Sequence, residues 1–308
     1  MFIDSATRSG IPSCFLLTID VEDWFQVENF KSAIPYSTWN EREFRVEQNT
    51  HRLLDLFDTI ATNPITTKNT KNPTNPKASF FILGWLAQKL PHLVREIHAR
   101  GHEVASHGFH HHLCTAQHTD ALRQDLTDSK SMLEDIIGAP VFGYRAPSFS
   151  INNDILKIIE DSGYQYDSSY NSFGLHGRYG KVDISGFPRT GLAHALSETF
   201  FELPVSNLTI FGKTLPWGGG GYFRLFPAYL FLQGIKSILK KESAYLFYMH
   251  PWEIDPDQPR MDDIPRTYKF RHYINLHKTH TRLSRLIERF KHCRFIPLHQ
   301  YLSQFNAV

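Results

Sequence analysis

Short apolar runs alternate along the chain with longer segments in which apolar residues recur at helical spacing. The runs predict strands at residues 14–19, 79–83, 103–106, 141–144, 200–204, 244–249 and 294–298. The helical segments lie at residues 50–60, 86–100, 120–137, 152–162 and 283–290. Continuous apolar runs are typical of strands buried on both faces of a parallel sheet. Repeated strand–helix units therefore predict an α/β fold, and their number favours a barrel over an open sheet.

Residues 63–77 interrupt this alternation. They are rich in Asn, Thr, Lys and Pro and have no apolar periodicity, so we predict a mobile surface loop. The remaining chain is well supplied with core residues, since 41% of its 308 residues are hydrophobic and 14% are aromatic. This composition excludes a wholly disordered protein.

Charge and hydropathy narrow the classes of partner. A net charge of +2 excludes polyanion binding through bulk charge, so we expect no nucleic-acid partner. The longest apolar stretch, residues 80–87, is far shorter than the ~20 residues of a membrane span. Three cysteines without metal-like spacing indicate no disulfide framework. Residues 1–13 lack the apolar region of a secretory signal, so we expect a cytoplasmic protein, or a periplasmic one if the start lies further upstream.

Polar residues follow four of the predicted strands at the point where each strand ends. Asp20, Glu22 and Asp23 follow the first strand and the histidine-rich segment 106–112 follows the third. Arg145 and His250 follow two later strands. Reactive residues of (β/α) barrels lie at the carboxyl ends of strands, so these side chains are expected to converge.

The spacing of two histidines suggests a metal. His107 and His111 are four residues apart, which lets one turn direct both imidazoles at an ion, while His110 and His112 point elsewhere. Three adjacent carboxylates repel one another, and a nearby cation is the simplest reason for them. Taken singly, each residue has a structural explanation: a turn-forming Asp20, a salt bridge at Arg145, a core histidine at His250. Their coincidence at the ends of four strands favours a site.

Four segments together resemble the NodB-type polysaccharide deacetylases of carbohydrate esterase family 4, over nearly the whole chain. They are TIDVED (18–23), SHGFHHH (106–112), RAPSFS (145–150) and FYMHPWEID (247–255). LPWGGGGYFR (215–224) and FRHYINLHKTHTRLSRL (270–286) resemble the subgroup found with exosortase-linked (PEP-CTERM) exopolysaccharide loci. The resemblance implies one distorted (β/α) barrel domain over residues 1–308, with a subgroup-specific C-terminal extension at about 255–308.

The resemblance also implies roles for individual residues. Asp20 would be the general base, Arg145 its orienting partner and His250 the general acid. His107 and His111 would bind one divalent metal, zinc before cobalt, nickel, iron or manganese. The commonest form of the first motif has a second aspartate where this chain has Val21, so the third ligand is Asp23 or Glu22; we prefer Asp23, because a turn after the strand can return it to the barrel mouth. The carboxylate that tunes His250 is left open between Asp167 and Glu202.

The activity implied by the resemblance is removal of N-acetyl groups from a polysaccharide that contains N-acetylhexosamine, or from its precursor. A backbone N–H near Ser148 would complete an oxyanion hole. Trp217 and Trp252 would line the sugar or the acetyl methyl group, or simply pack at the barrel rim. The particular polymer and the oligomeric state are left open.

Two other functions compete with this one. An amidohydrolase acting on a small cyclic amide, as in allantoinase-like relatives, is disfavoured because some of those proteins have lost the metal and this chain keeps His107 and His111. A catalytically silent glycan-binding protein is disfavoured because it needs no base, orienting residue and acid such as Asp20, Arg145 and His250.

Overall fold

The computed structural model describes residues 12–62, 74–174 and 179–305. Its centre is a sheet whose strands run in the order β11-β1-β2-β3-β4-β5-β8-β7-β6, with β12 also paired to β1. The pairs from β11 to β8 are parallel, and β7 and β6 add antiparallel. The bounds are β1 Cys14–Val21, β2 Ala78–Ile82, β3 Glu103–Ser106, β4 Gly143–Tyr144, β5 Tyr166–Asp167, β6 Arg189–Thr190, β7 Ala193–Ala195, β8 Phe201–Glu202, β11 Ala244–Met249 and β12 Arg294–Phe295.

The sheet curls without closing through regular strand pairs. Between β8 and β11, the backbone N–H of Ser206 donates to Leu246 O, and Ser206 Oγ accepts the N–H of Leu246 at 2.8 Å. Further along β11, Tyr248 N donates to Gly218 O. These irregular bridges complete the wall where no regular strand pair does. The predicted distorted (β/α) barrel is therefore confirmed, in the form of a curled, partly open sheet.

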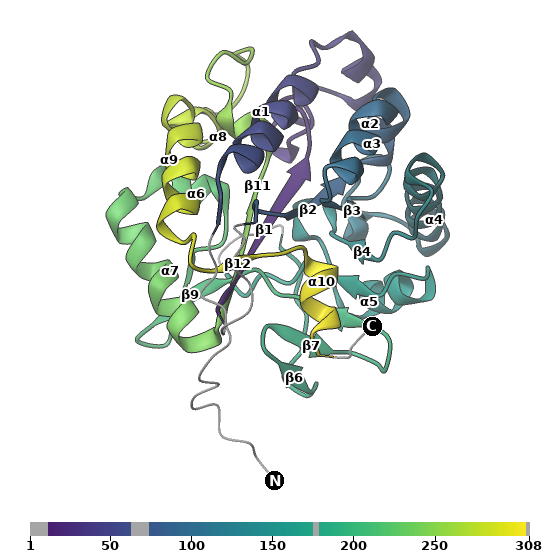
Figure 1. Ribbon diagram of the computed structural model, residues 1–308. Coiled ribbons are helices and arrows are strands. Elements are labelled where there is room, and N and C mark those ends of the chain that lie inside the picture. The colour runs from purple at the N-terminus through teal and green to yellow at the C-terminus, as the bar shows by residue number, and fades with distance from the viewer. Residues whose placement is uncertain (1–11, 63–73, 175–178, 306–308) are drawn as a thin grey trace.

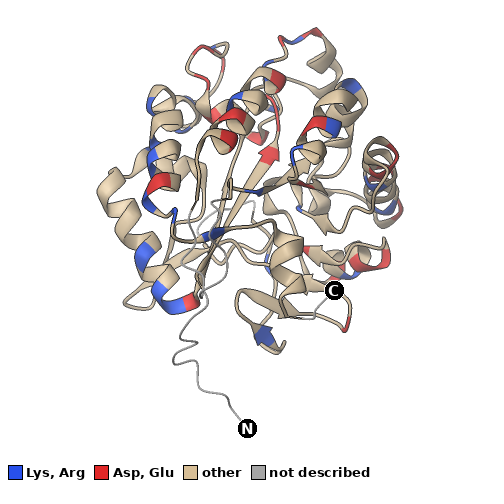
Figure 2. Ribbon diagram, in the orientation of Figure 1, with Lys and Arg blue, Asp and Glu red and all other residues tan. Residues whose placement is uncertain are grey.

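Helices surround the sheet on its outer side (Figure 1). Several of these helices follow the predicted segments closely. Charged residues lie mainly on the outer helices and loops, and acidic residues also lie at the carboxyl end of β1 (Figure 2). Their bounds are α1 Val46–Thr59, α2 Gly84–Lys89, α3 Pro91–Ala99, α4 Thr119–Ile137, α5 Asn153–Asp161 and α9 Leu276–Arg289. Every residue of β1 is buried, as expected for a strand covered on both faces.

The predicted helix 86–100 is two helices. Pro91 begins α3, and the residue before it, Leu90, has φ −128° and ψ 54°, outside the helical region. Proline disfavours the helical conformation in the residue that precedes it and lacks the N–H that would continue α2. The break was visible in the sequence as Pro91 within an otherwise regular apolar pattern.

Several elements have no counterpart among the predictions. The longest is α7, Ala228–Glu242, and the predicted strand 294–298 is only β12 followed by a helix. Others are the short strands β5, β6 and β7, the helices α6 Gly220–Leu225, α8 Arg266–Tyr273 and α10 Leu298–Ser303, and the antiparallel pair β9 Asn207–Ile210 and β10 Lys213–Pro216. Of the predicted loop 63–77, residues 63–73 lie outside the described residues. No helix in the described part of the chain is both long and apolar enough to cross a membrane.

The register of the parallel strands decides where the chemistry lies. Ile19 is opposite Met249, and Ser106 is opposite both Ile82 and Tyr144. The residues that follow these positions lie at one edge of the sheet, Asp20 still within β1 and the other three just beyond the ends of their strands. Asp20, His107, Arg145 and His250 therefore arrive at the same mouth of the barrel.

Candidate active site

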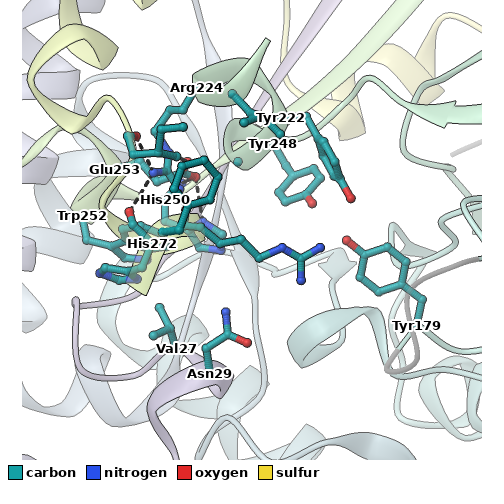
Figure 3. A pocket seen from close by; sticks show the side chains of 15 residues that line it. Val27, Asn29, Tyr179, Tyr222, Arg224, Tyr248, His250, Trp252, Glu253 and His272 are labelled. Carbon is teal, nitrogen blue, oxygen red and sulfur yellow. Dashed lines mark hydrogen bonds and ion pairs between the residues drawn. The ribbon is translucent and has the colours of Figure 1, made fainter. Parts of the chain in front are cut away.

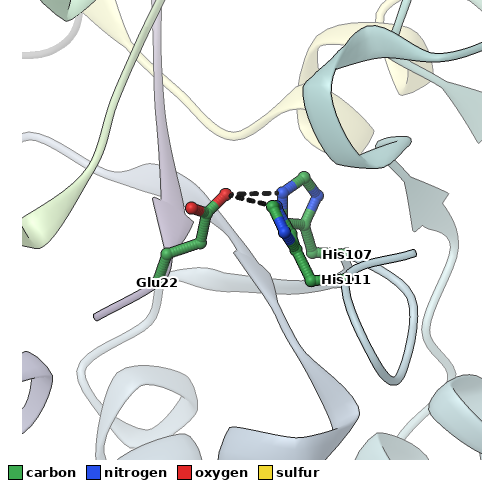
Figure 4. Close-up of side chains that lie close together, drawn as sticks. All are labelled: Glu22, His107 and His111. Atoms are coloured by element: carbon green, nitrogen blue, oxygen red, sulfur yellow. Dashed lines mark hydrogen bonds and ion pairs between the residues drawn. The ribbon is translucent and has the colours of Figure 1, made fainter. Parts of the chain in front are cut away.

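Three buried side chains form a cluster suited to a metal ion. Glu22 Oε1 lies 3.0 Å from His107 Nε2 and 3.0 Å from His111 Nε2 (Figure 4). His107 directly follows β3, and His111 reaches the cluster with a positive φ of 57°, which is uncommon outside glycine. Such conformations concentrate at functional sites, where the surrounding structure enforces them.

The protonation of the donor atoms fits a cation. His107 Nδ1 lies 2.7 Å from the carbonyl oxygen of Arg145, which can only accept, so Nδ1 carries the proton. In the neutral ring, Nε2 then carries a lone pair that faces Oε1 of Glu22. Two hydrogen-bond acceptors therefore lie 3.0 Å apart. Burial raises the pKa of Glu22, but His111, His250 and His107 outweigh it and hold this pKa well below its usual range. A divalent ion between these atoms would satisfy all three donors.

The expected third ligand, Asp23, is not part of this cluster. Its Oδ1 accepts the N–H of Trp24, and its Oδ2 accepts the N–H groups of Arg45 and Val46 at the start of α1. Glu22 occupies the position beside the histidines instead. Side chains alternate along a strand, so Asp20 and Glu22 share a face, whereas Asp23 turns away to the helix.

Asp20 and Arg145 form a buried ion pair. Arg145 Nη1 donates to Asp20 Oδ1 at 2.6 Å and to Thr18 Oγ1 at 2.8 Å. The rest of the guanidinium is bonded to Ser168, through Nε to its carbonyl and through Nη2 to its hydroxyl, both at 2.9 Å. The guanidinium carbon also lies 4.1 Å from the centre of the Phe81 ring. A buried ion pair of this kind contributes little to the stability of the fold. The second oxygen of Asp20, Oδ2, is not bonded to Arg145 and faces the cleft.

His250 lies between the carboxylates of Asp20 and Glu22 on one side and the carboxylate of Glu253 on the other. Its Nε2 is 4.0 Å from Asp20 Oδ2 and 3.7 Å from Glu22 Oε1, and its Nδ1 is 2.9 Å from Glu253 Oε1. Burial lowers the pKa of His250, but Glu22, Glu253 and Asp20 together raise it to about 9. The imidazole is thus held in its protonated form near neutral pH.

Sequence reasoning did not find Glu253. The two candidates it offered, Asp167 and Glu202, are instead opposite each other in the sheet, where Asp167 accepts the hydroxyl of Ser169 and Glu202 accepts the N–H of Tyr170. Burial raises the pKa of both carboxyls. A usable signal was present, because Glu253 is three residues after His250 in the HPWE segment, the distance at which one helical turn brings side chains together.

Glu253 is itself fixed from behind. Arg224 Nε donates to Glu253 Oε2 at 2.7 Å, and both side chains are buried. A Cβ at Gly220 would collide with the Glu253 carboxylate. Gly220 of the glycine run 218–221 therefore allows close packing against the residue that holds His250.

The predicted substrate-binding residues divide into two groups. Trp252 and Ser148 line the cleft, and Ser148 has a positive φ of 52°. Trp217 does not line it: its indole Nε1 donates to Phe231 O and its ring stacks on Phe231, beneath α7. Its alternative role, packing, is the one that the structure shows.

The cleft that joins these groups has a volume of about 160 Å³. Four of the six residues expected to carry base, acid or metal chemistry line its walls, while Arg145 lies behind Asp20 and Glu22 takes the place of Asp23. The lining includes Asp20, Glu22, His107, His111, Ser148 and His250. A buried metal-type cluster, an oriented carboxylate and a protonated histidine in one cleft have the composition of a hydrolytic site.

Two family models match this chain. Residues 69–166 match the family described as Polysaccharide deacetylase, and residues 168–302 match the Domain of unknown function (DUF3473). A peptidoglycan-N-acetylglucosamine deacetylase from Bacillus cereus is 30% identical over 89 residues, which are 29% of this chain and 41% of that protein. The chain spans about two fifths of the length of the curated relatives it matches.

Solved structures share the fold at low sequence identity. A putative polysaccharide deacetylase from Mycobacterium smegmatis is 18% identical with a TM-score of 0.60, over 98% of this chain and 93% of that one. Puue allantoinase is 12% identical with a TM-score of 0.59, over 98% of this chain and 95% of that one. The comparisons therefore show a Polysaccharide deacetylase match over residues 69–166, a DUF3473 match over residues 168–302, and a fold shared with these solved structures.

Proposed function

We propose that this protein is a metal-dependent hydrolase that removes the N-acetyl group from an N-acetylhexosamine unit of a polysaccharide or of its precursor. The observation that carries the proposal is the meeting of Glu22, His107 and His111 with the Asp20–Arg145 pair and His250 in one cleft. Amide hydrolysis needs an activated water, a stabilised carbonyl oxygen and a proton for the leaving amine, and these groups correspond to those needs.

Glu22, His107 and His111 are the residues that would hold the metal. Two imidazole nitrogens and one carboxylate leave a position open, as in catalytic zinc sites, so zinc is our first candidate, ahead of cobalt, nickel, iron and manganese. A divalent ion bound there would supply Lewis-acid activation of water and of the acetyl oxygen.

The protein's own groups move the protons. Oδ1 of Asp20 is tied to Arg145, so Oδ2 is the atom that takes the proton of the attacking water. Glu253 holds Nδ1–H of His250, and Nε2–H is the proton delivered to the leaving sugar nitrogen. The N–H of Ser148, at the cleft wall, is the oxyanion donor that we propose.

The shape of the site favours a glycan over a small cyclic amide. The cleft continues past His250 and Trp252 into a second cavity of about 190 Å³, which gives room for a neighbouring sugar. A small cyclic amide would leave this second cavity unused. The likeness to an allantoinase concerns the fold alone.

We also propose an exopolysaccharide as the polymer, on the basis of the segments 215–224 and 270–286. Both segments contribute walls to the second cavity, with Tyr222 and Arg224 from the first and His272 and Ile274 from the second. Features that distinguish a subgroup are expected where its substrate differs.

The test is hydrolysis of N-acetylated oligosaccharides by the purified protein. Acetate and free amine should appear in equal amounts, disappear after chelation and return when zinc is added. Asp20→Asn, purified and metal-loaded in the same way, is the matched inactive control. Binding of the oligosaccharides without any acetate release would instead support a silent glycan-binding protein, and hydrolysis of allantoin alone would support the cyclic amidohydrolase.

A further inference from the structure

A second cavity lies on the far side of His250 from the metal cluster. It has a volume of about 190 Å³ and shares Tyr248, His250 and Trp252 with the catalytic cleft (Figure 3). Because the two cavities share these walls, the second cavity offers room for the next unit of a ligand that presents its acetamide to Asp20.

Arg224 fixes the wall of this cavity. Its Nη1 donates to the carbonyl oxygens of His272 at 2.7 Å and Ile274 at 2.9 Å, and its Nη2 donates to that of Arg271 at 3.1 Å. In return, Asn275 Nδ2 donates to Arg224 O at 2.9 Å. The segments 215–224 and 270–286, which are far apart in the sequence, are thereby joined into one preformed surface.

The cavity carries one cation that no carboxylate of the described residues pairs with. Arg224 is paired with Glu253 at 2.7 Å, and His250, which also lines the cavity, faces the carboxylates of Glu253, Glu22 and Asp20. Burial, followed by the nearby Arg224, lowers the pKa of His272 well below its usual range, so that ring is neutral. The side chain of Arg271 is exposed at the cavity wall, and no carboxylate of the described residues forms an ion pair with it.

The other walls suit a sugar. Tyr222, Tyr248, Trp252 and Phe270 supply aromatic surface, and the hydroxyl groups of Tyr179, Tyr222 and Tyr248 turn toward one another (Figure 3). Aromatic faces pack against the C–H faces of a pyranose, while phenol hydroxyls reach its polar edge. Aromatic walls with an unpaired cation at the edge favour a sugar that bears an anion.

We propose that this cavity binds an acidic sugar next to the N-acetylated unit, with its anionic group paired to Arg271. The inference rests on the proposed deacetylase function and adds a substrate class to it: a glycan that bears carboxylate or phosphate groups. A guanidinium forms two parallel hydrogen bonds with either oxyanion, and this geometry discriminates against a neutral hydroxymethyl group.

The first experiment measures binding by calorimetry with the chelated wild-type protein, so that no substrate is consumed. The probes are a tetrasaccharide of alternating glucuronate and N-acetylglucosamine, and the same compound with its carboxyl groups reduced to alcohols. The acidic form should bind about tenfold more tightly, the lower end of what a charged hydrogen bond contributes. N-acetylglucosamine 1-phosphate, used as a competitor, distinguishes a phosphate preference from a carboxylate preference.

Variants of one helix test the residue assignment. Arg271→Gln should bring the ratio of the two affinities close to one. Arg271→Lys should give an intermediate ratio, because lysine keeps the charge but lacks the two parallel N–H donors of the guanidinium. Arg266→Gln removes the same charge from the same helix but from an exposed side chain outside the cavity, and should leave the ratio unchanged. Equal affinity of the wild-type protein for both probes, or a preference that survives in Arg271→Gln, would overturn the proposal.

Failure of this inference is distinguishable from failure of the proposed function. Acetate release from acidic and reduced probes at the same kcat/KM, in wild-type protein and in Arg271→Gln, would retain the deacetylase and remove the acidic subsite. Tight, Arg271-dependent binding of the acidic probe without any acetate release would retain the subsite and remove the deacetylase.

Discussion

His107 Nδ1 lies 2.7 Å from the backbone carbonyl oxygen of Arg145, whose side chain donates to Asp20 at 2.6 Å. One residue therefore orients the metal-type cluster through its backbone and the proposed base through its side chain. The backbone is held independently, since Arg145 N donates to Ser106 O. The two functions of Arg145 should be separable by substitution.

Arg145→Lys should impair turnover while sparing metal binding. A lysine keeps the charge but cannot reproduce the bonds to Thr18, Asp20 and Ser168 at once, so Asp20 loses its orientation. We expect kcat/KM to fall about 10²-fold, within the range for an impaired general base. Metal content by elemental analysis should stay equal to that of the wild-type protein, and a parallel loss of metal would contradict the separation.

Glu22→Gln should weaken metal binding more than about 100-fold, because an amide replaces an anionic ligand and even outer partners of metal ligands contribute 10–100-fold. Competition with a chromogenic chelator measures the affinity. Glu28→Gln is the matched control, since Glu28 lines the same cleft without belonging to the cluster.

Asp23→Asn should keep the metal but lower the free energy of unfolding by about 1–2 kcal/mol, through weakened bonds to the start of α1. Loss of metal affinity in Asp23→Asn but not in Glu22→Gln would instead assign Asp23 as the third metal ligand.

His250→Ala and Asp20→Asn should each lose about 10²–10⁴ in rate on an N-acetylated sugar. They should differ on an O-acetyl ester with a good leaving group, which needs no protonation as it departs. The ester should rescue His250→Ala far more than Asp20→Asn, as measured by the ratio of kcat/KM values. Equal rescue of both variants would remove the assignment of acid and base.

The alkaline limit of activity should depend on Glu253. Burial lowers the pKa of His250, but Glu22 and Glu253 are the first groups that raise it, to about 9. The acid form is lost as pH rises through this pKa. A divalent cation held by Glu22 would repel the imidazolium and would move the limit below about 9. Glu253→Gln should move it lower still, whereas Glu28→Gln should not. A limit that stays in place in Glu253→Gln would assign it to another group.

Acid should destabilise the fold through His102, which is remote from the cleft. His102 Nδ1 accepts the N–H of Ala78 at 3.2 Å, and burial followed by Lys77 lowers its pKa to about 4. The unfolded chain has the higher pKa, about 6.5, so it binds the proton first. Stability is complete above pH ~6.5 and declines toward pH ~4, by up to about 3 kcal/mol.

His102→Asn keeps an acceptor for Ala78 but does not titrate. Denaturant unfolding of this variant and of the wild-type protein should therefore give stabilities that converge as pH falls from about 7 to 5. Other buried histidines titrate equally in both proteins and cancel in the difference. Parallel curves would show that His102 is not the group responsible.

The sequence by itself determined the class of fold and the edge at which chemistry gathers. Apolar runs placed β1, β3 and β11 within a residue or two, because strands covered on both faces must be continuously apolar. Parallel strands end on one edge, so Asp20 and His250 could be expected to meet before any coordinates were known.

Only the tertiary structure decided which neighbouring residue does what. Glu22 and Asp23 both follow the end of β1, and their different directions depend on the turn toward α1. Glu253 reaches His250 through a turn that is held by Arg224 from a distant segment. Trp217 is removed from the cleft by packing under α7. Periodicity specifies the face of a strand on which a side chain lies, but beyond the last residue of the strand its direction depends on contacts with chain that is remote in sequence.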